Sequence, residues 1–342
     1  MRSICLILFS VLALAMGLVP ADAGPILDRI RAAGVVHCGS FERPGIAVDY
    51  GEVQAASADQ AGQEPTTTPW HGLAVDLCRA MADAVLGSPD KIAFHSYDEA
   101  DDLAALSAGE DDVAFLTASE MHAAGVIGKM VPGPAMFIES VAVMVPAADG
   151  ARHLADVDAG KGICFMTGSS AERLLSAYFE ATKTDWRPHP YTEEGEMLDA
   201  YDAQSCHAIA GERTALAMMA LEGGANGLKS VILPDALEAY PILSATSLDD
   251  GAWTSIVAWT VHTLMAGDRP SNRWTVGGVS ALPVPLTDDG LDADWQKRLI
   301  DAFGSYGALI DRNLGAKSPL DLPAGLNALP ERGGALVAPF LD

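Results

Sequence analysis

Apolar residues recur at helical spacing in several segments of the chain. In residues 73–86 they fall on one face of a helix, which Gly87 and Pro89 then end. The same spacing predicts helices over residues 25–33, 101–108, 172–179 and 252–265. Each of these segments is therefore expected to pack an apolar face against a core.

Short apolar runs of the buried-strand kind lie between the helical segments, at residues 34–39, 92–94, 112–116, 141–145 and 162–166. Strands that alternate with helices predict a parallel α/β sheet. The alternation starts again near residue 141, so a second α/β lobe is expected to begin there. Residues 239–246 are expected to cross back to the first lobe as a strand.

A strand, a glycine, serines and a helix follow one another in residues 161–175. Gly168 permits a tight turn, and Ser169 or Ser170 is a favoured N-cap residue. Backbone N–H groups at such a turn, with the positive end of the helix dipole behind them, can hold a carboxylate, a phosphate or a neutral acceptor. The alternative is an ordinary α/β connection that binds nothing.

The N-terminus has the features of a secretory signal peptide. A basic start at Arg2 precedes an apolar run over residues 4–19, and small residues at Ala21 and Ala23 form a cleavage site. A retained membrane anchor is the competing interpretation, but the run is short and no second span follows. We therefore expect cleavage near Ala23 and a periplasmic mature protein.

Composition narrows the classes of partner. Hydrophobic residues make up 49% of the chain and charged residues 20%, which is enough for two cores of ordinary size. The formal net charge of −25 disfavours nucleic acid and an anionic membrane surface as partners.

Removal of the signal peptide leaves an even number of cysteines: Cys38, Cys78, Cys164 and Cys206. In an oxidising compartment this favours disulfides over a metal site or a nucleophile. Three pairings are possible. We favour Cys38 with Cys78 and Cys164 with Cys206, because each pair then stays inside one half of the chain.

Several motifs resemble the periplasmic amino-acid-binding proteins of ABC importers, solute-binding family 3, and most closely their long general L-amino-acid-binding branch. The motifs occupy residues 31–39, 75–87, 163–170 and 201–206, and a C-terminal run over residues 306–329 is typical of that branch. The resemblance implies a two-lobed α/β fold of the type II binding-protein kind, with a parallel-type sheet in each lobe and a two-strand hinge. It implies capture of a small solute by lobe closure and delivery to an ABC permease by a monomer.

This resemblance divides the chain into lobe 1 (residues 24–140), lobe 2 (141–244) and a second part of lobe 1 with a C-terminal extension (245–342). In relatives, lobe 1 grips the ligand's α-carboxylate with an arginine after a Thr/Ser-rich segment. Here that position is expected at Ala124, so the arginine is absent. Thr117 and Ser119 remain as hydroxyl candidates, and Glu120 adds a polar group.

On lobe 2, the resemblance assigns ligand contacts to Thr167, Gly168, Ser169 and Ser170. The acidic residue that normally binds the α-ammonium is expected at Glu212.

Arg213 follows Glu212 directly and leaves two hypotheses open. If Arg213 points inward, it replaces the missing carboxylate anchor; otherwise the pocket takes a ligand without an α-carboxylate, which we favour slightly. A solvated surface arginine is the alternative for this residue. Phe41, Trp70 and His71 are loop candidates for the cleft wall, with core packing as the alternative.

Enzymatic function is disfavoured, because the chain has neither a Gly-x-Ser-x-Gly nor a His-Glu-x-x-His motif. We therefore expect no catalytic residues, no metal and no cofactor. Glu120 and Glu212 could converge as acid and base with His122, but hydrogen bonding to a ligand is the more common role of such residues. The alternative to an importer component is a periplasmic accessory or sensor protein that no longer binds amino acids.

Overall fold

A computed structural model describes residues 24–49, 70–97, 108–222, 228–269, 286 and 289–338. The predicted signal peptide and most of the helix predicted over residues 101–108 lie outside the described residues.

Within these residues a nine-stranded sheet has the strand order β4-β1-β5-β11-β6-β9-β7-β8, and β10 pairs with β6. Its strands are β1 (Val36–Ser40), β4 (Ile92–Ser96), β5 (Val113–Thr117), β6 (Met130–Pro146), β7 (Ile163–Met166), β8 (Pro188–Tyr191), β9 (Ala208–Glu212), β10 (Ser230–Ile232) and β11 (Glu238–Ser247). A separate pair joins β2 (Val48–Asp49) to β3 (Trp70–His71).

The described helices cover the faces of the sheet. They are α1 (Pro25–Ala33), α3 (Leu73–Leu86), α5 (Ala118–Ala123), α6 (Ser170–Thr182), α7 (Glu194–Asp202), α8 (Arg213–Glu222), α9 (Gly251–Ala266), α10 (Trp295–Phe303) and α11 (Tyr306–Asn313). Local sequence sets several of these ends. Both α1 and α3 stop at a glycine in the left-handed region, Gly34 at φ 71° and Gly87 at φ 65°. The sequence predicts this role for Gly87, whereas Gly34 is expected to begin a strand, which in the structure starts at Val36.

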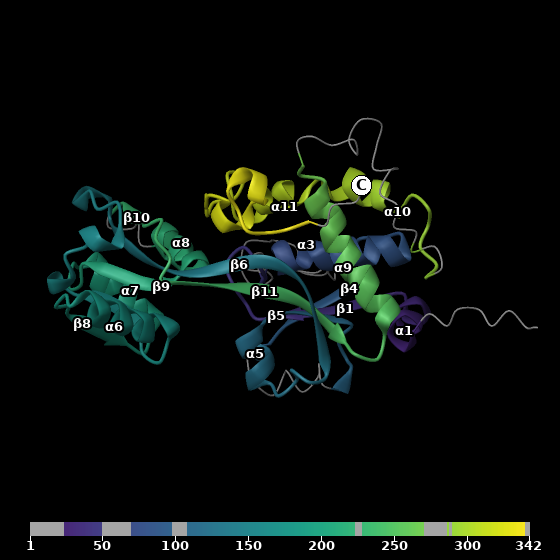
Figure 1. Ribbon diagram of the computed structural model, residues 1–342, viewed down its shortest axis with the longest axis horizontal. Helices are drawn as coiled ribbons and strands as arrows, with labels where there is room; N and C mark the ends of the chain where they lie inside the picture. The colour runs from purple at the N-terminus through teal and green to yellow at the C-terminus, as the bar shows by residue number, and fades with distance from the viewer. Residues whose placement is uncertain are drawn as a thin grey trace, which may run out of the picture.

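The two halves of the molecule are joined by β6 and β11, which run antiparallel through its centre (Figure 1). On one side β1 pairs in parallel with β4 and β5, and on the other β7 pairs in parallel with β8 and β9. The predicted two-lobed α/β fold is confirmed. Because β6 and β11 continue through residues 140 and 244, the predicted lobe boundaries both fall inside the connecting strands and stay a prediction.

The predicted strand over residues 141–145 is only the last part of β6, which begins at Met130. Pro132, Gly133 and Pro134 interrupt the apolar pattern and conceal the strand's first half. The pairing of β6 with β11 shifts register around Leu243, opposite this segment. Prolines are tolerated in a strand at such irregularities, so the sequence alone underestimates the strand's length.

Two separate main cores form, and we call the parts around them the first and second lobe. The first packs α3, α9, α10 and α11 against β1 and the near half of β6. The second packs α6 against β7, β9 and the far half of β6. No helix among the described residues is long and apolar enough to cross a membrane.

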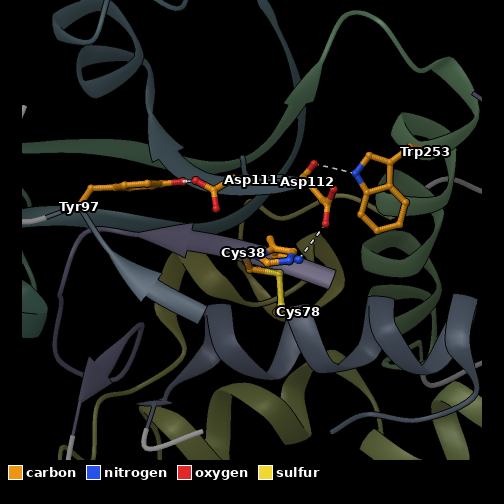
Figure 2. The surroundings of a disulfide bond; sticks show 7 residues. Cys38, Cys78, Tyr97, Asp111, Asp112 and Trp253 are labelled. Carbon is orange, nitrogen blue, oxygen red and sulfur yellow. Dashed lines mark hydrogen bonds between the residues drawn. A yellow bond between two sulfur atoms is a disulfide. The ribbon is translucent and has the colours of Figure 1, made fainter. Parts of the chain in front are cut away.

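The disulfides form as predicted, Cys38 with Cys78 and Cys164 with Cys206. The first ties β1 to α3, as Figure 2 shows, and the second ties β7 to the turn before β9. All four cysteines are at most 1% exposed, so each bridge lies inside the core of its own lobe.

Asp112 organises the start of β5 (Figure 2). Its carboxylate accepts hydrogen bonds from Arg29 and from the backbone N–H of His37, and its carbonyl accepts from the Trp253 indole at 2.7 Å. Burial raises the pKa of this carboxyl, although the two donors oppose the shift. The neighbouring Asp111 accepts from the Tyr97 hydroxyl at 2.8 Å.

Candidate functional site

A cavity of about 350 Å³ lies between the two lobes. Its walls come from the first lobe, the second lobe and β11: Arg43, Thr117, Ala118, Ser119, Glu120, Ser170, Arg173, Glu212, Glu238, Tyr240 and Pro241. The predicted ligand residues Thr117, Ser119, Glu120, Ser170 and Glu212 are therefore brought together. They approach from the ends of β5 and β9 and from the starts of α5 and α6.

Thr117 and Glu120 hold each other at the start of α5. The Thr117 hydroxyl accepts from the Glu120 N–H at 3.2 Å, and Glu120 Oε2 accepts from the Thr117 N–H at 2.7 Å. This reciprocal capping box follows from the Thr-x-x-Glu spacing of the sequence. The capping box uses only one carboxylate oxygen of Glu120 and leaves Oε1 for another partner.

Arg43 forms an ion pair with Glu120. The Arg43 Nη2 donates to Glu120 Oε1, and its Nε lies 4.0 Å from Glu212 Oε2 in the second lobe. The side chain also lies over the Phe41 ring, with 5.8 Å from Cζ to the ring centroid. Sequence reasoning missed Arg43, although Phe41, two residues before it, is a loop candidate for the cleft wall.

Glu212 ends β9 and receives a second partner from the hinge. The Tyr240 hydroxyl donates to Glu212 Oε1. Burial, together with this carboxylate, raises the pKa of Tyr240 well above its usual range, so the phenol stays protonated and acts as a donor. Glu212 thus links the second lobe to β11 and, through its other oxygen, to the first lobe.

Glu139 lies on β6 opposite Tyr240 of β11. It is 1% exposed and accepts from the Thr214 hydroxyl at 2.5 Å and from the backbone N–H groups of Ser140 and Arg213 at 2.7 and 3.2 Å. Burial raises its pKa to about 7, an effect that these donors only partly offset. An ionisable group is therefore buried in the hinge, opposite a residue of the cavity wall.

The structure places Arg213 away from the cavity. Its Nε donates to Ser140 Oγ at 2.9 Å, and its remaining nitrogens donate to carbonyls of residues 233–235. It lines a different cavity, which the hinge shares with residues 322–327. Its guanidinium therefore ties the start of α8 to the loop after β10.

Backbone N–H groups of the turn after β7 already donate hydrogen bonds to acceptors within the protein. The Gly168 N–H donates to Glu172 of its own helix at 2.7 Å, and the Thr167 N–H donates to the Tyr191 carbonyl at 2.8 Å. Ser169 Oγ is buried with no hydrogen-bond partner. Of this predicted segment, Ser170 alone is among the residues that line the described cavity.

The three loop candidates for the cleft wall lie in different surroundings. Trp70 is buried and packs on Phe94 with ring centroids 5.5 Å apart, which matches the packing alternative. His71 lines another cavity, with Asp76 and Arg312. Phe41 packs on Tyr97 and supports Arg43, so it contributes to the cleft through that arginine.

Among the described residues no group of histidine, cysteine, aspartate or glutamate has the arrangement of a metal site. His122, the third member of the acid–base hypothesis, is exposed and is not among the residues that line the cavity. What the cleft presents is carboxylates, guanidinium groups and hydroxyls, which suit a small polar ligand.

Known proteins resemble this chain along nearly its whole length. The General L-amino acid-binding periplasmic protein AapJ of Rhizobium johnstonii is 28% identical over 95% of each chain. The Glutamate/glutamine/aspartate/asparagine-binding protein BztA of Rhodobacter capsulatus is 27% identical over 97% of each chain. The Putative amino-acid ABC transporter-binding protein YhdW of Escherichia coli K12 is 26% identical over 93% of each. No family model matches the chain.

Solved structures agree. An ABC transporter periplasmic binding protein from Brucella ovis with glutathione bound has a TM-score of 0.66 and 26% identity, and the match covers 90% of this chain and 96% of that one. A substrate-binding domain of a putative amino-acid ABC transporter from Streptococcus pneumoniae shares the fold at a TM-score of 0.55 and 11% identity. These findings confirm the resemblance found in the sequence. The relatives are binding proteins rather than enzymes, as predicted for this chain.

Proposed function

Because the chain is related over nearly its full length to the periplasmic amino-acid-binding proteins of ABC importers, we propose that it is an extracytoplasmic substrate-binding protein. It captures a small polar solute that carries an amine, in the cleft between its lobes. The lobes close over the solute about β6 and β11, and the loaded monomer delivers it to an ABC permease from the periplasm.

The convergence of Glu120 and Glu212 from opposite lobes carries this proposal. Glu238 pairs with Arg173 at 3.0 Å, so those two charges balance each other. Glu120 and Glu212 then share the single guanidinium of Arg43, which leaves the cavity with one negative charge in excess. A positive group on the ligand pairs with this excess carboxylate charge, so a ligand that carries an ammonium is favoured over a plain organic acid or a neutral sugar.

Hydroxyl groups complete the recognition surface. Thr117 and Ser119 lie on one side of the cavity, Ser170 on the other, and Tyr240 on the hinge. Groups from both lobes make the contact surface complete only when the lobes approach each other. Ligand binding therefore stabilises the closed arrangement in preference to the open one.

The test is a binding screen on residues 24–342, refolded so that no co-purified ligand hides the response. Amino acids, polyamines, sugars, organic acids, alcohols and glutathione are compared by thermal shift and then by calorimetry. Solute at a hundred times its dissociation constant stabilises the fold by about 2.7 kcal/mol, a readable rise in melting temperature. We expect stabilisation by solutes that carry an amine.

Glu212→Gln is the matching variant. It keeps the hydrogen-bond acceptor for Tyr240 but removes the charge, so binding of the amine should weaken by about tenfold or more without loss of folding. Unchanged affinity in this variant removes Glu212 from the site. Arg152→Met, on the exposed surface of the second lobe, is the control.

One observation favours the accessory or sensor alternative. The charged groups of the cleft already have partners within the protein, Glu120 with Arg43 and Glu212 with Tyr240. A scaffold that no longer binds a solute needs such internal pairing. A flat response to every solute class supports this alternative and contradicts an importer role.

A further inference from the structure

We infer that Arg43 is a relocated anchor for a ligand carboxylate, so that the solute is a zwitterion whose carboxylate binds Arg43 and whose ammonium binds Glu120 and Glu212. This inference rests on the proposed function and specifies its ligand class. It replaces both hypotheses drawn from the sequence, because neither Arg213 nor a ligand without a carboxylate is then required.

The first support is the position of the guanidinium. Arg43 is 8% exposed and lines the cavity at the point where the two lobes face each other. It is the first-lobe guanidinium among the described residues that line this space, and Arg173 on the other side is already paired with Glu238. A carboxylate entering from the first-lobe side therefore meets Arg43.

The second support is an unused donor. Nη1 of Arg43 is buried and makes no hydrogen bond, whereas Nη2 is used by Glu120. A buried N–H without a partner is unfavourable, and native structures generally avoid it. A guanidinium presents Nη1 and Nη2 as a planar pair that suits both oxygens of one carboxylate. A ligand carboxylate thus supplies the acceptor that the protein does not.

The third support is that Glu120 keeps a hydrogen bond when the ligand's carboxylate displaces it from Arg43. Glu120 stays in place when Nη2 is taken, because its other oxygen is held by the Thr117 N–H at 2.7 Å. Its Oε1 is then free for the ligand's ammonium, near Glu212. The ion pair between Arg43 and Glu120 is thereby replaced by two ion pairs with one zwitterion: Arg43 pairs with its carboxylate, and Glu120 pairs with its ammonium.

The loop that carries Arg43 is rigid enough for this task. Arg43 and Ala47 exchange backbone hydrogen bonds, each at 3.0 Å, and the loop turns at Gly45 with φ 73°. A Cβ at Gly45 would lie 2.6 Å from the Leu314 side chain, so the turn is packed against the end of α11. The guanidinium is therefore presented from a fixed backbone, which lowers the entropy cost of binding.

The experiment compares matched pairs that differ only by the carboxylate: L-arginine with agmatine, L-lysine with cadaverine, and L-phenylalanine with phenethylamine. Affinities are measured by calorimetry on residues 24–342. For the pair that binds, the wild type should prefer the amino acid by about thirtyfold or more. Arg43→Met should abolish that preference while it binds the amine as tightly as before, or more tightly.

Arg43→Lys is the second variant and keeps the charge without the planar donor pair. It should retain folding and lie between wild type and Arg43→Met in its preference for the carboxylated partner. Arg152→Met should leave the preference unchanged. Circular dichroism and melting curves establish that each variant is folded.

The outcomes separate the inference from the function on which it rests. Wild-type protein that binds amine and amino acid equally, or an Arg43→Met variant that keeps the full preference, overturns the carboxylate anchor and leaves the importer proposal standing. Wild-type protein that binds no solute overturns the proposed function, and the inference fails with it.

Discussion

The side chain of Asn327 makes two hydrogen bonds with the backbone of Ile138 in the hinge strand β6. Its Oδ1 accepts from the Ile138 N–H at 2.6 Å, and its Nδ2 donates to the Ile138 carbonyl at 3.0 Å. The C-terminal segment thereby pairs with β6 as a neighbouring strand would. Ile138 lies next to Glu139, so this contact fixes the strand beside the ligand cleft.

Asn327→Ala should lower the free energy of unfolding by about 1–3 kcal/mol, because both backbone groups of Ile138 lose their partner. Asn327→Asp keeps an acceptor for the N–H but no donor for the carbonyl, so it should give an intermediate loss. Urea unfolding at neutral pH measures both variants. Equal stability of wild type and Asn327→Ala would show that solvent replaces the pair at no cost.

Glu139 should make stability fall as pH rises. Its pKa is raised to about 7 in the folded protein from 4.5, so the folded state holds the proton more tightly between these values. The free energy of unfolding therefore decreases from pH 4.5 to about 7 and then levels off. The loss attributable to this group is about 3 kcal/mol.

The check for Glu139 is Glu139→Gln, which cannot titrate. Its free energy of unfolding relative to wild type should increase between pH 5 and pH 8, measured by urea unfolding at several pH values. A constant difference across this range would mean that Glu139 titrates normally in the folded state.

Arg213 should matter for stability and not for ligand binding. Arg213→Met removes the hydrogen bonds to Ser140 and to carbonyls of residues 233–235 while it keeps part of the aliphatic packing. We expect a loss of about 1.5–3 kcal/mol in the free energy of unfolding. Solute affinity should change by less than about threefold. A carboxylate-selective loss of binding would instead identify Arg213 as the anchor.

The two disulfides should contribute separately. They close loops with sequence separations of 40 and 42, for which loop-closure entropy predicts about 4 kcal/mol each. The double variants Cys38→Ser/Cys78→Ser and Cys164→Ser/Cys206→Ser should each lose stability of this order in urea unfolding. A much smaller loss in one of them would indicate that its reduced loop keeps native-like structure when unfolded.

The sequence by itself determined the local elements, the two α/β lobes and the cysteine pairing. Residues 25–33 and 73–86 could be predicted closely, because helical spacing and, for the second helix, the terminal Gly87 act within a few residues. The disulfides followed from an even cysteine count and the division of the chain. Thr117 and Glu212 were predicted as site residues from the resemblance, and Glu120 as a polar group that the family's pattern lacks. The structure brings all three to one cavity.

Only the tertiary structure decided which guanidinium faces the cleft. Arg43 precedes Glu120 and Glu212 by long stretches of chain, and no spacing rule connects a loop after one strand to the end of a strand in the other lobe. Arg213 adjoins Glu212 in sequence but turns away, because Ser140 and the carbonyls after β10 accept its donors. Side-chain direction is set by such long-range partners, which local sequence does not encode.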